Sequence, residues 1–188
     1  MDANKNIIIY NHEKLEILKR RIKKDGPKKL HIISDFDRTL TKAYVRGKET
    51  PSLISILRQG SFLSAEYSQK ANDLYEKYQP IESDPHAPLP KKKKAMQSWW
   101  LAHFRLLIKT GLNFKDVERV INCGKIKLRR GALKFFDLLY QFEIPLVIMS
   151  ASGIGQEAIC LYLKKEKKLY PNVHIISNRF KWNSCGRM

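Results

Sequence analysis

Two aspartates, Asp35 and Asp37, stand two residues apart directly after a short apolar run, Leu30–Ser34. Carboxylates this close repel each other unless a cation lies between them or one of them is protonated. With this spacing one aspartate can attack as a nucleophile while the other acts as an acid, and a hard cation such as Mg²⁺ can bind through oxygen ligands. The alternative is that both carboxylates only cap the turn after the run.

A second polar segment follows another apolar run. Ser150 comes directly after Pro145–Met149 and precedes a glycine-containing turn into a helix. A serine hydroxyl and the backbone N–H groups at a helix N-terminus can hold a phosphate oxygen, although serine is also a common helix cap. Taken together, the two segments predict a phosphoryl-transfer site between adjacent strands.

Strands that alternate with helices are predicted to position these residues. The runs at 30–34, 145–149 and 173–177 are predicted to be buried strands of a parallel sheet, and we expect helices at about 12–25, 132–142 and 156–168. The segment between the two polar motifs is far longer than the roughly 30 residues of a plain strand–helix–strand crossover. The surplus is expected to form an inserted helical cap over the carboxyl ends of the strands, where open parallel sheets bind ligands.

The inserted segment is interpreted as helical throughout, with one interruption. A run rich in proline at 80–90 is predicted to be a loop. Asn113 and Asp116 have the spacing of a capping box and predict a shorter helix to Ile121.

Composition excludes some classes of protein. The chain has 36 Lys+Arg against 18 Asp+Glu, a net charge of +18, but its basic clusters are scattered and none is interleaved with aromatic residues. We therefore interpret the charge as solvated surface and do not favour nucleic acid as a partner. No apolar run approaches the roughly 20 residues of a membrane span. The sequence has no apolar signal segment, and it has three cysteines, an odd number. We therefore expect a soluble, cytoplasmic chain.

Several segments, in one order along the chain, resemble a known family. Asp35-Phe36-Asp37-Arg38-Thr39-Leu40-Thr41 resembles the first motif of the haloacid dehalogenase-like phosphatases. The chain from about residue 30 onward resembles the cytosolic pyrimidine 5′-nucleotidase family, which includes relatives that act on 7-methylguanosine monophosphate. The further segments that carry this resemblance are 78–85, 96–103, 128–131, 144–145, 150–151 and 171–178. The resemblance implies an α/β fold, with a Rossmannoid haloacid dehalogenase-like core at 1–42 and 125–188 and a helical cap at 43–124.

The resemblance also implies roles for individual residues. Asp35 would attack the phosphorus of a nucleoside 5′-monophosphate and become an aspartyl-phosphate, while Asp37 would protonate the leaving oxygen and later activate water. Mg²⁺ would be held by the Asp35 carboxylate and the Asp37 carbonyl. Ser150 would hold the phosphate with Ala151 lining the same loop, and Glu82 would contact the nucleobase. Glu82 could instead be an exposed loop acid.

Three more residues of the cap have two possible roles. Trp99, Trp100 and His103 share a helix face with Met96 and Leu107, which favours packing within the cap. Stacking of a nucleobase on one of the tryptophans is the alternative.

The sequence departs from the family pattern at three places. Ser152 stands where glycine is usual, and Ala102 stands where a base-contacting serine is common, which leaves the nucleobase open between UMP, CMP and 7-methyl-GMP. Family members continue with a phosphate-binding lysine and a final acidic motif, whereas this chain ends at Met188. We therefore expect a truncated chain whose incomplete sheet exposes an apolar face.

Three functional hypotheses follow. The first is Mg²⁺-dependent hydrolysis of nucleoside 5′-monophosphates through an aspartyl-phosphate. The second is a capped phosphatase for another small monophosphate. The third is a catalytically impaired homologue that acts as a basic binding protein. The pattern does not indicate an oligomeric state.

Overall fold

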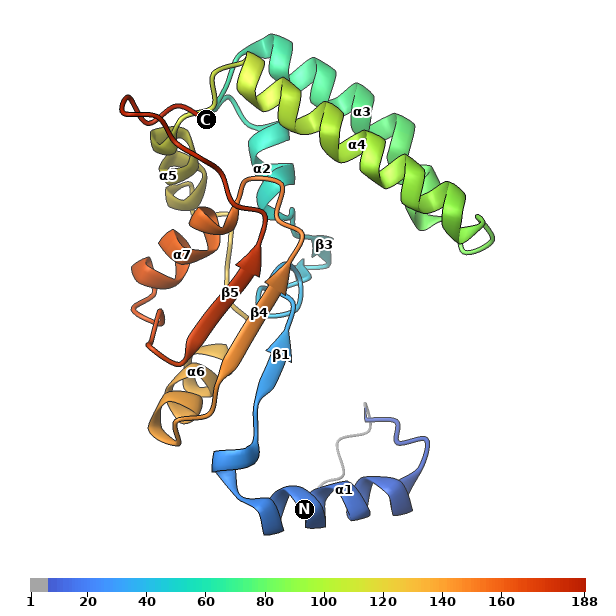
Figure 1. The fold of residues 1–188 in the computed structure, drawn as a ribbon, viewed down its shortest axis with the longest axis vertical. Coiled ribbons are helices and arrows are strands. Elements are labelled where there is room, and N and C mark those ends of the chain that lie inside the picture. The colour runs from blue at the N-terminus through green and yellow to red at the C-terminus, as the bar shows by residue number, and fades with distance from the viewer. Residues whose placement is uncertain (1–6) are drawn as a thin grey trace.

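A three-stranded parallel sheet lies at the centre of the molecule. The computed structural model describes residues 7–188. The strand order is β1–β4–β5, with bounds Ile32–Ser34, Leu146–Ser150 and Val173–Ser177. Ile32 pairs with Leu146 and Ser150 pairs with Ser177, so the carboxyl ends of all three strands lie at one edge (Figure 1). The three predicted strands and their parallel arrangement are confirmed.

Helices cover one face of this sheet. The crossovers into β4 and β5 run through α6 (Ala132–Gln141) and α7 (Gln156–Lys165), which lie on the same side (Figure 1). Right-handed crossovers between strands that progress in one direction place both helices on one face. Phe36 is fully buried and meets the ring of Tyr162 edge to face, with centroids 5.8 Å apart. One part of the core therefore lies between the sheet and these two helices, and the same cluster of buried residues continues into the helices of the inserted segment.

The opposite face of the sheet is apolar and exposed. Side chains alternate between the two faces of a strand, and the residues that point away from α6 and α7 include Ile33, Met149 and Ile176. These side chains are 62%, 49% and 57% exposed. The expectation of an exposed apolar face is confirmed.

The amino-terminal helix lies at the other end of the sheet from the strand carboxyl ends (Figure 1). α1 (His12–Asp25) begins at Asn11, whose side-chain oxygen accepts a hydrogen bond from the Lys14 N–H at 2.8 Å, and it ends at Gly26. A short 3₁₀ turn, Pro27–Lys29, connects it to β1. α1 buries no residue.

Three helices follow the first loop and lie beyond the carboxyl edge of the sheet (Figure 1). They are α2 (Leu53–Gln59) and the long antiparallel pair α3 (Ala65–Ser83) and α4 (Leu89–Lys109). One expectation for this segment is wrong, because residues 44–49 form a hairpin, β2 (Tyr44–Val45) and β3 (Lys48–Glu49), rather than a helix. Arg46 and Gly47 at its tip have φ of 51° and 74°, as tight hairpin turns require.

The predicted loop at 80–90 is also wrong in its extent. α3 continues through Pro80 to Ser83, and α4 begins at Leu89 with Pro90 in its first turn. A proline in the first turn costs little because the N–H groups there have no helical partner. Pro80 lies in the last turn of α3, where it removes one helical hydrogen bond, and the helix ends three residues later. The connection is therefore only five residues long, 84–88.

The last helix of the inserted segment is confirmed. α5 (Phe114–Asn122) begins with the predicted capping box, in which Asn113 and Asp116 exchange side-chain-to-backbone hydrogen bonds of 3.1 Å. α5 contacts α7, and the Lys165 ammonium donates to the Ile121 carbonyl at 3.3 Å. The expected boundary of the cap at residue 124 stays a prediction. No helix among residues 7–188 is both long and apolar enough to cross a membrane.

Because one face of the sheet is covered and the other is exposed, truncations on the two faces of one strand should destabilise the chain by very different amounts. Leu146→Ala removes a fully buried side chain and should lower the free energy of unfolding by about 2–5 kcal/mol. Met149→Ala, on the exposed face, should lower it by less than about 1 kcal/mol. Urea unfolding of both variants measures the difference, and equal losses would contradict the one-sided packing.

Candidate active site

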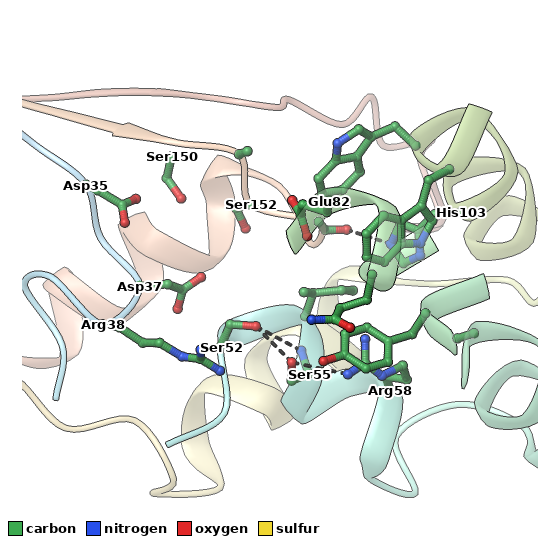
Figure 2. Close-up of a pocket in the computed structure, with 18 of the residues that line it drawn as sticks. Asp35, Asp37, Arg38, Ser52, Ser55, Arg58, Glu82, His103, Ser150 and Ser152 are labelled. Atoms are coloured by element: carbon green, nitrogen blue, oxygen red, sulfur yellow. Dashed lines mark hydrogen bonds between the residues drawn. The ribbon is translucent and has the colours of Figure 1, made fainter. Parts of the chain in front are cut away.

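A cavity of about 400 Å³ opens between the carboxyl ends of the strands and helices α2–α4 (Figure 2). All five residues singled out for chemistry or substrate binding line it, namely Asp35, Asp37, Glu82, Ser150 and Ala151. They come from three separate stretches of the chain. The fold therefore brings together the two strand-end segments and the helical insert.

The first loop presents its two aspartates to the cavity because the residue between them is anchored. Phe36 is fully buried, and its carbonyl accepts hydrogen bonds from the N–H groups of Leu40 and Thr41, both at 3.1 Å. This tight turn leaves Asp35 and Asp37 facing the cavity (Figure 2).

Asp37 has the most perturbed carboxyl group in the site. Burial, reinforced by the neighbouring charge of Asp35, raises its pKa from 3.8 to about 6. The Leu53 N–H donates to its Oδ1 at 3.1 Å and opposes that rise. A carboxyl group with this pKa holds a proton over a range of pH in which an ordinary aspartate is ionised, so it can serve as a proton donor.

The second loop lies beside the first at the carboxyl edge of the sheet. Ser150 lies beside Asp35 (Figure 2), at the end of β4, the strand that pairs with β1. Ser152 is buried, and its carbonyl accepts a hydrogen bond from the Asn178 side-chain amide at 3.0 Å. The loop is thus held from β5 as well as from β4.

Helix α2 contacts both loops directly, and helix α4 contacts the second loop. The Leu53 N–H that binds Asp37 belongs to the first residue of α2. His103 of α4 is hydrogen-bonded through Nε2 to the Gly153 carbonyl at 3.1 Å. A Cβ atom at Gly153 would lie 2.9 Å from the Ile54 side chain, so only glycine allows α2 to approach so closely. The helical insert therefore packs directly against the two loops.

His103, which makes the contact between α4 and the second loop, is buried and neutral. Burial lowers its pKa from 6.5 to about 4, and the bond to Gly153 only partly opposes the change. Its burial agrees with the favoured role in packing, and it also forms part of the cavity wall.

The far wall of the cavity is aromatic and carries Glu82. The predicted loop position of Glu82 is wrong, because the residue lies in the last turn of α3. Trp99 stacks between Tyr78 and Trp100, with ring centroids 5.8 and 6.5 Å away. Both tryptophans line the cavity, so their packing and a contact with a ligand are compatible.

The residues of the cavity wall that sequence reasoning missed include Arg58 and Tyr67. Arg58 of α2 is 6% exposed, and Tyr67 of α3 is fully buried, yet both line the cavity. The signal available in the sequence was an arginine among the apolar residues of a short helix, Leu53–Leu57. Tyr67 carried no signal, because its spacing matched that of a core position.

An acidic loop after one strand, a hydroxyl-bearing loop after its parallel neighbour and a helical insert over both define the haloacid dehalogenase-like fold. Comparison with known protein families narrows the assignment within this fold. Residues 38–188 match the family described as pyrimidine 5′-nucleotidase (UMPH-1), and the chain belongs to that family. The resemblance noted in the sequence is confirmed.

Individual relatives agree with this assignment. The chain is 35% identical over 165 residues to the 7-methylguanosine phosphate-specific 5′-nucleotidase of Homo sapiens, a match that covers 88% of this chain and 54% of the relative. The protein of that name from Gallus gallus is 32% identical over 167 residues, covering 89% and 57%. The chain thus spans little more than half the length of these relatives. The crystal structure of cytosolic 5′-nucleotidase IIIB bound to cytidine superposes with a TM-score of 0.79 at 27% identity, covering 96% of this chain and 60% of that one.

The buried, neutral state of His103 predicts a pH dependence of stability. Because its pKa is lower in the folded than in the unfolded chain, its contribution to stability is full above pH 6.5 and is lost as the pH falls toward 4. Between pH 7 and pH 5 the wild-type chain should lose about 2 kcal/mol more of its free energy of unfolding than His103→Gln. The exposed His86→Gln serves as the matched control and should follow the wild type. Identical pH profiles for wild type and His103→Gln would contradict this assignment.

Proposed function

We propose that this chain carries the site of a nucleoside 5′-monophosphate phosphatase, with Asp35 as nucleophile and Asp37 as acid and base. The observation that carries the proposal is the shared cavity, in which the aspartate pair and Ser150 form one wall and Glu82 and the two tryptophans form the other. One wall has the chemistry for a phosphate, and the other suits a planar base with hydrogen-bond donors.

The proposed reaction gives each of the two carboxyl groups a separate role. An Asp35 carboxylate oxygen attacks the phosphorus, the bond from phosphorus to the 5′-oxygen breaks, and protonated Asp37 gives its proton to that oxygen. The nucleoside leaves, and an aspartyl-phosphate remains on Asp35. Asp37, now ionised, takes a proton from water as the water attacks the phosphorus, which releases phosphate and restores both groups. The raised pKa of Asp37 supports this assignment.

The loop after β1 fits Mg²⁺ as a cofactor. The Asp35 carboxylate and the Asp37 carbonyl are oxygen donors, and Mg²⁺ is commonly bound by one or two carboxylates while keeping several waters. Residues 7–188 contain no cluster of three His, Cys, Asp or Glu side chains that could hold a metal alone. When bound, Mg²⁺ would neutralise charge on the phosphoryl group and on the closely spaced aspartates.

The substrate class rests on the cap wall and on the relatives. Glu82 can accept hydrogen bonds from a base edge, and Ser150 with Ala151 would hold the phosphate. Relatives are named for 7-methylguanosine phosphate, and the superposed structure holds cytidine. We propose 7-methyl-GMP and the pyrimidine nucleotides CMP and UMP as substrates, with the segment 43–124 acting as the cap and with the cytoplasm as the compartment.

Replacement of the nucleophile tests this proposal. Asp35→Asn should reduce phosphate release from 7-methyl-GMP, CMP or UMP by a factor of about 10³ or more, because the amide cannot form the aspartyl-phosphate. Asp73→Asn, an exposed aspartate of α3, is the matched control and should retain activity. Wild-type release from phosphoserine or sugar phosphates alone would favour the capped phosphatase for another monophosphate. No release from any substrate would favour the impaired binding protein.

Replacement of Glu82 tests whether this residue of the cavity wall contributes to binding of the nucleobase. Glu82→Gln should raise KM for 7-methyl-GMP by about tenfold, because a charge-assisted hydrogen bond is lost. It should leave the hydrolysis of p-nitrophenyl phosphate, which has no nucleobase, unchanged. Glu76→Gln, an exposed neighbour on α3, provides the control for steady-state kinetics. An equal effect on both substrates would contradict a role for Glu82 in base binding.

A further inference from the structure

An arginine without a charged partner forms part of the cavity wall. Arg58 is 6% exposed, and none of the ion pairs within residues 7–188 includes it. Its Nη2 makes one long contact, 3.5 Å, to the Ser55 hydroxyl, and its buried Nε has no hydrogen-bond partner among the described residues. A buried guanidinium with so few of its donors satisfied is costly unless a ligand supplies an acceptor.

The surroundings of Arg58 hold the guanidinium in place without neutralising it. The guanidinium carbon lies 3.8 Å from the centre of the Tyr75 ring, which is the geometry of a cation–π contact. The hydroxyl of the fully buried Tyr67 also lacks a partner within the described part of the chain, and it lines the same cavity. Two orphaned polar groups at one cavity wall indicate that an acceptor enters there.

The position of Arg58 separates it from the phosphate end of the cavity. Figure 2 shows Arg58 beside Ser55, on the opposite side of the cavity from Asp35 and Ser150. Tyr75, which packs on Arg58, lies 6.1 Å from the ring of Trp99. Arg58 therefore belongs to the aromatic wall that faces the base in the proposed function.

We propose that Arg58 is a specificity-determining residue that donates a hydrogen bond to a carbonyl oxygen of the nucleobase. This inference rests on the proposed function. Cytosine, uracil and 7-methylguanine all carry a ring carbonyl, whereas adenine carries none. Arg58 therefore favours carbonyl-bearing bases over adenine, because adenine offers only ring-nitrogen acceptors, which lie at other positions than an exocyclic carbonyl oxygen.

Calorimetric titration of nucleosides tests this selection without needing the phosphate chemistry. Wild-type chain should bind cytidine and 7-methylguanosine more tightly than adenosine. Arg58→Met should weaken the two carbonyl-bearing nucleosides by about ten- to hundredfold, the usual range for a hydrogen bond to a charged group. It should leave adenosine unchanged, so the preference collapses. Methionine keeps the apolar stem of the side chain, and thermal unfolding of the variant checks that the fold survives.

Two further variants sharpen the test. Arg58→Lys keeps the charge but not the planar fork of donors, and it should give an intermediate loss. Arg105→Met removes an exposed arginine from α4 and should bind all three nucleosides as the wild type does. An equal loss for cytidine and adenosine in Arg58→Met would place the contact on the ribose and overturn the inference. No preference in the wild type, or no nucleoside binding at all, would also overturn it.

The outcome is distinguishable from a failure of the proposed function. If the nucleosides bind with the expected dependence on Arg58 while 7-methyl-GMP, CMP and UMP release no phosphate, hydrolysis is refuted and the role of Arg58 stands. If phosphate is released while Arg58→Met retains the preference over adenosine, the role of Arg58 is refuted and hydrolysis stands.

Discussion

The site depends on how closely the inserted helices approach the two strand-end loops. α2 contributes the Leu53 N–H to the Asp37 carboxylate, and α4 contributes His103 to the Gly153 carbonyl. The approach leaves no room for a side chain at Gly153, where Ile54 would meet a Cβ at 2.9 Å. α2 is thus held to the first loop and packs against the second, while α4 is held to the second loop.

The same approach creates the electrostatic character of the cavity. Desolvation of Asp37 raises the pKa of its carboxyl group to about 6, a range useful for proton transfer. Burial also keeps His103 neutral and leaves Arg58 as an uncompensated cation on the aromatic wall. The net charge of +18 is spread over the surface and does not describe the site. A few buried groups, rather than the net charge of the chain, therefore make the phosphate end of the cavity different from its aromatic wall.

Much of the fold could be predicted because its signals are local. The apolar runs marked β1, β4 and β5, and the reciprocal pattern of Asn113 and Asp116 marked the start of α5. The hairpin at 44–49 was missed because its turn, Arg46-Gly47, lacks the usual asparagine or aspartate before the glycine. The extent of α3 was missed because proline signals a break, whereas here the helix continues past Pro80 for three more residues.

The sequence by itself determined which residues could do chemistry, namely the aspartate pair and the serine of the second loop. It also determined the family, because the segments typical of that family occur in the same order along the chain. Their spacing follows from strand ends, which are local features, so no tertiary information was needed to select them. Only the tertiary structure decided which cap residues face these loops. Arg58 and Tyr67 occupy helical positions that are typical of a core, and whether such a position meets a core or a cavity depends on the packing of α2 against α3. That packing is a contact between elements, and no local pattern of residues encodes it.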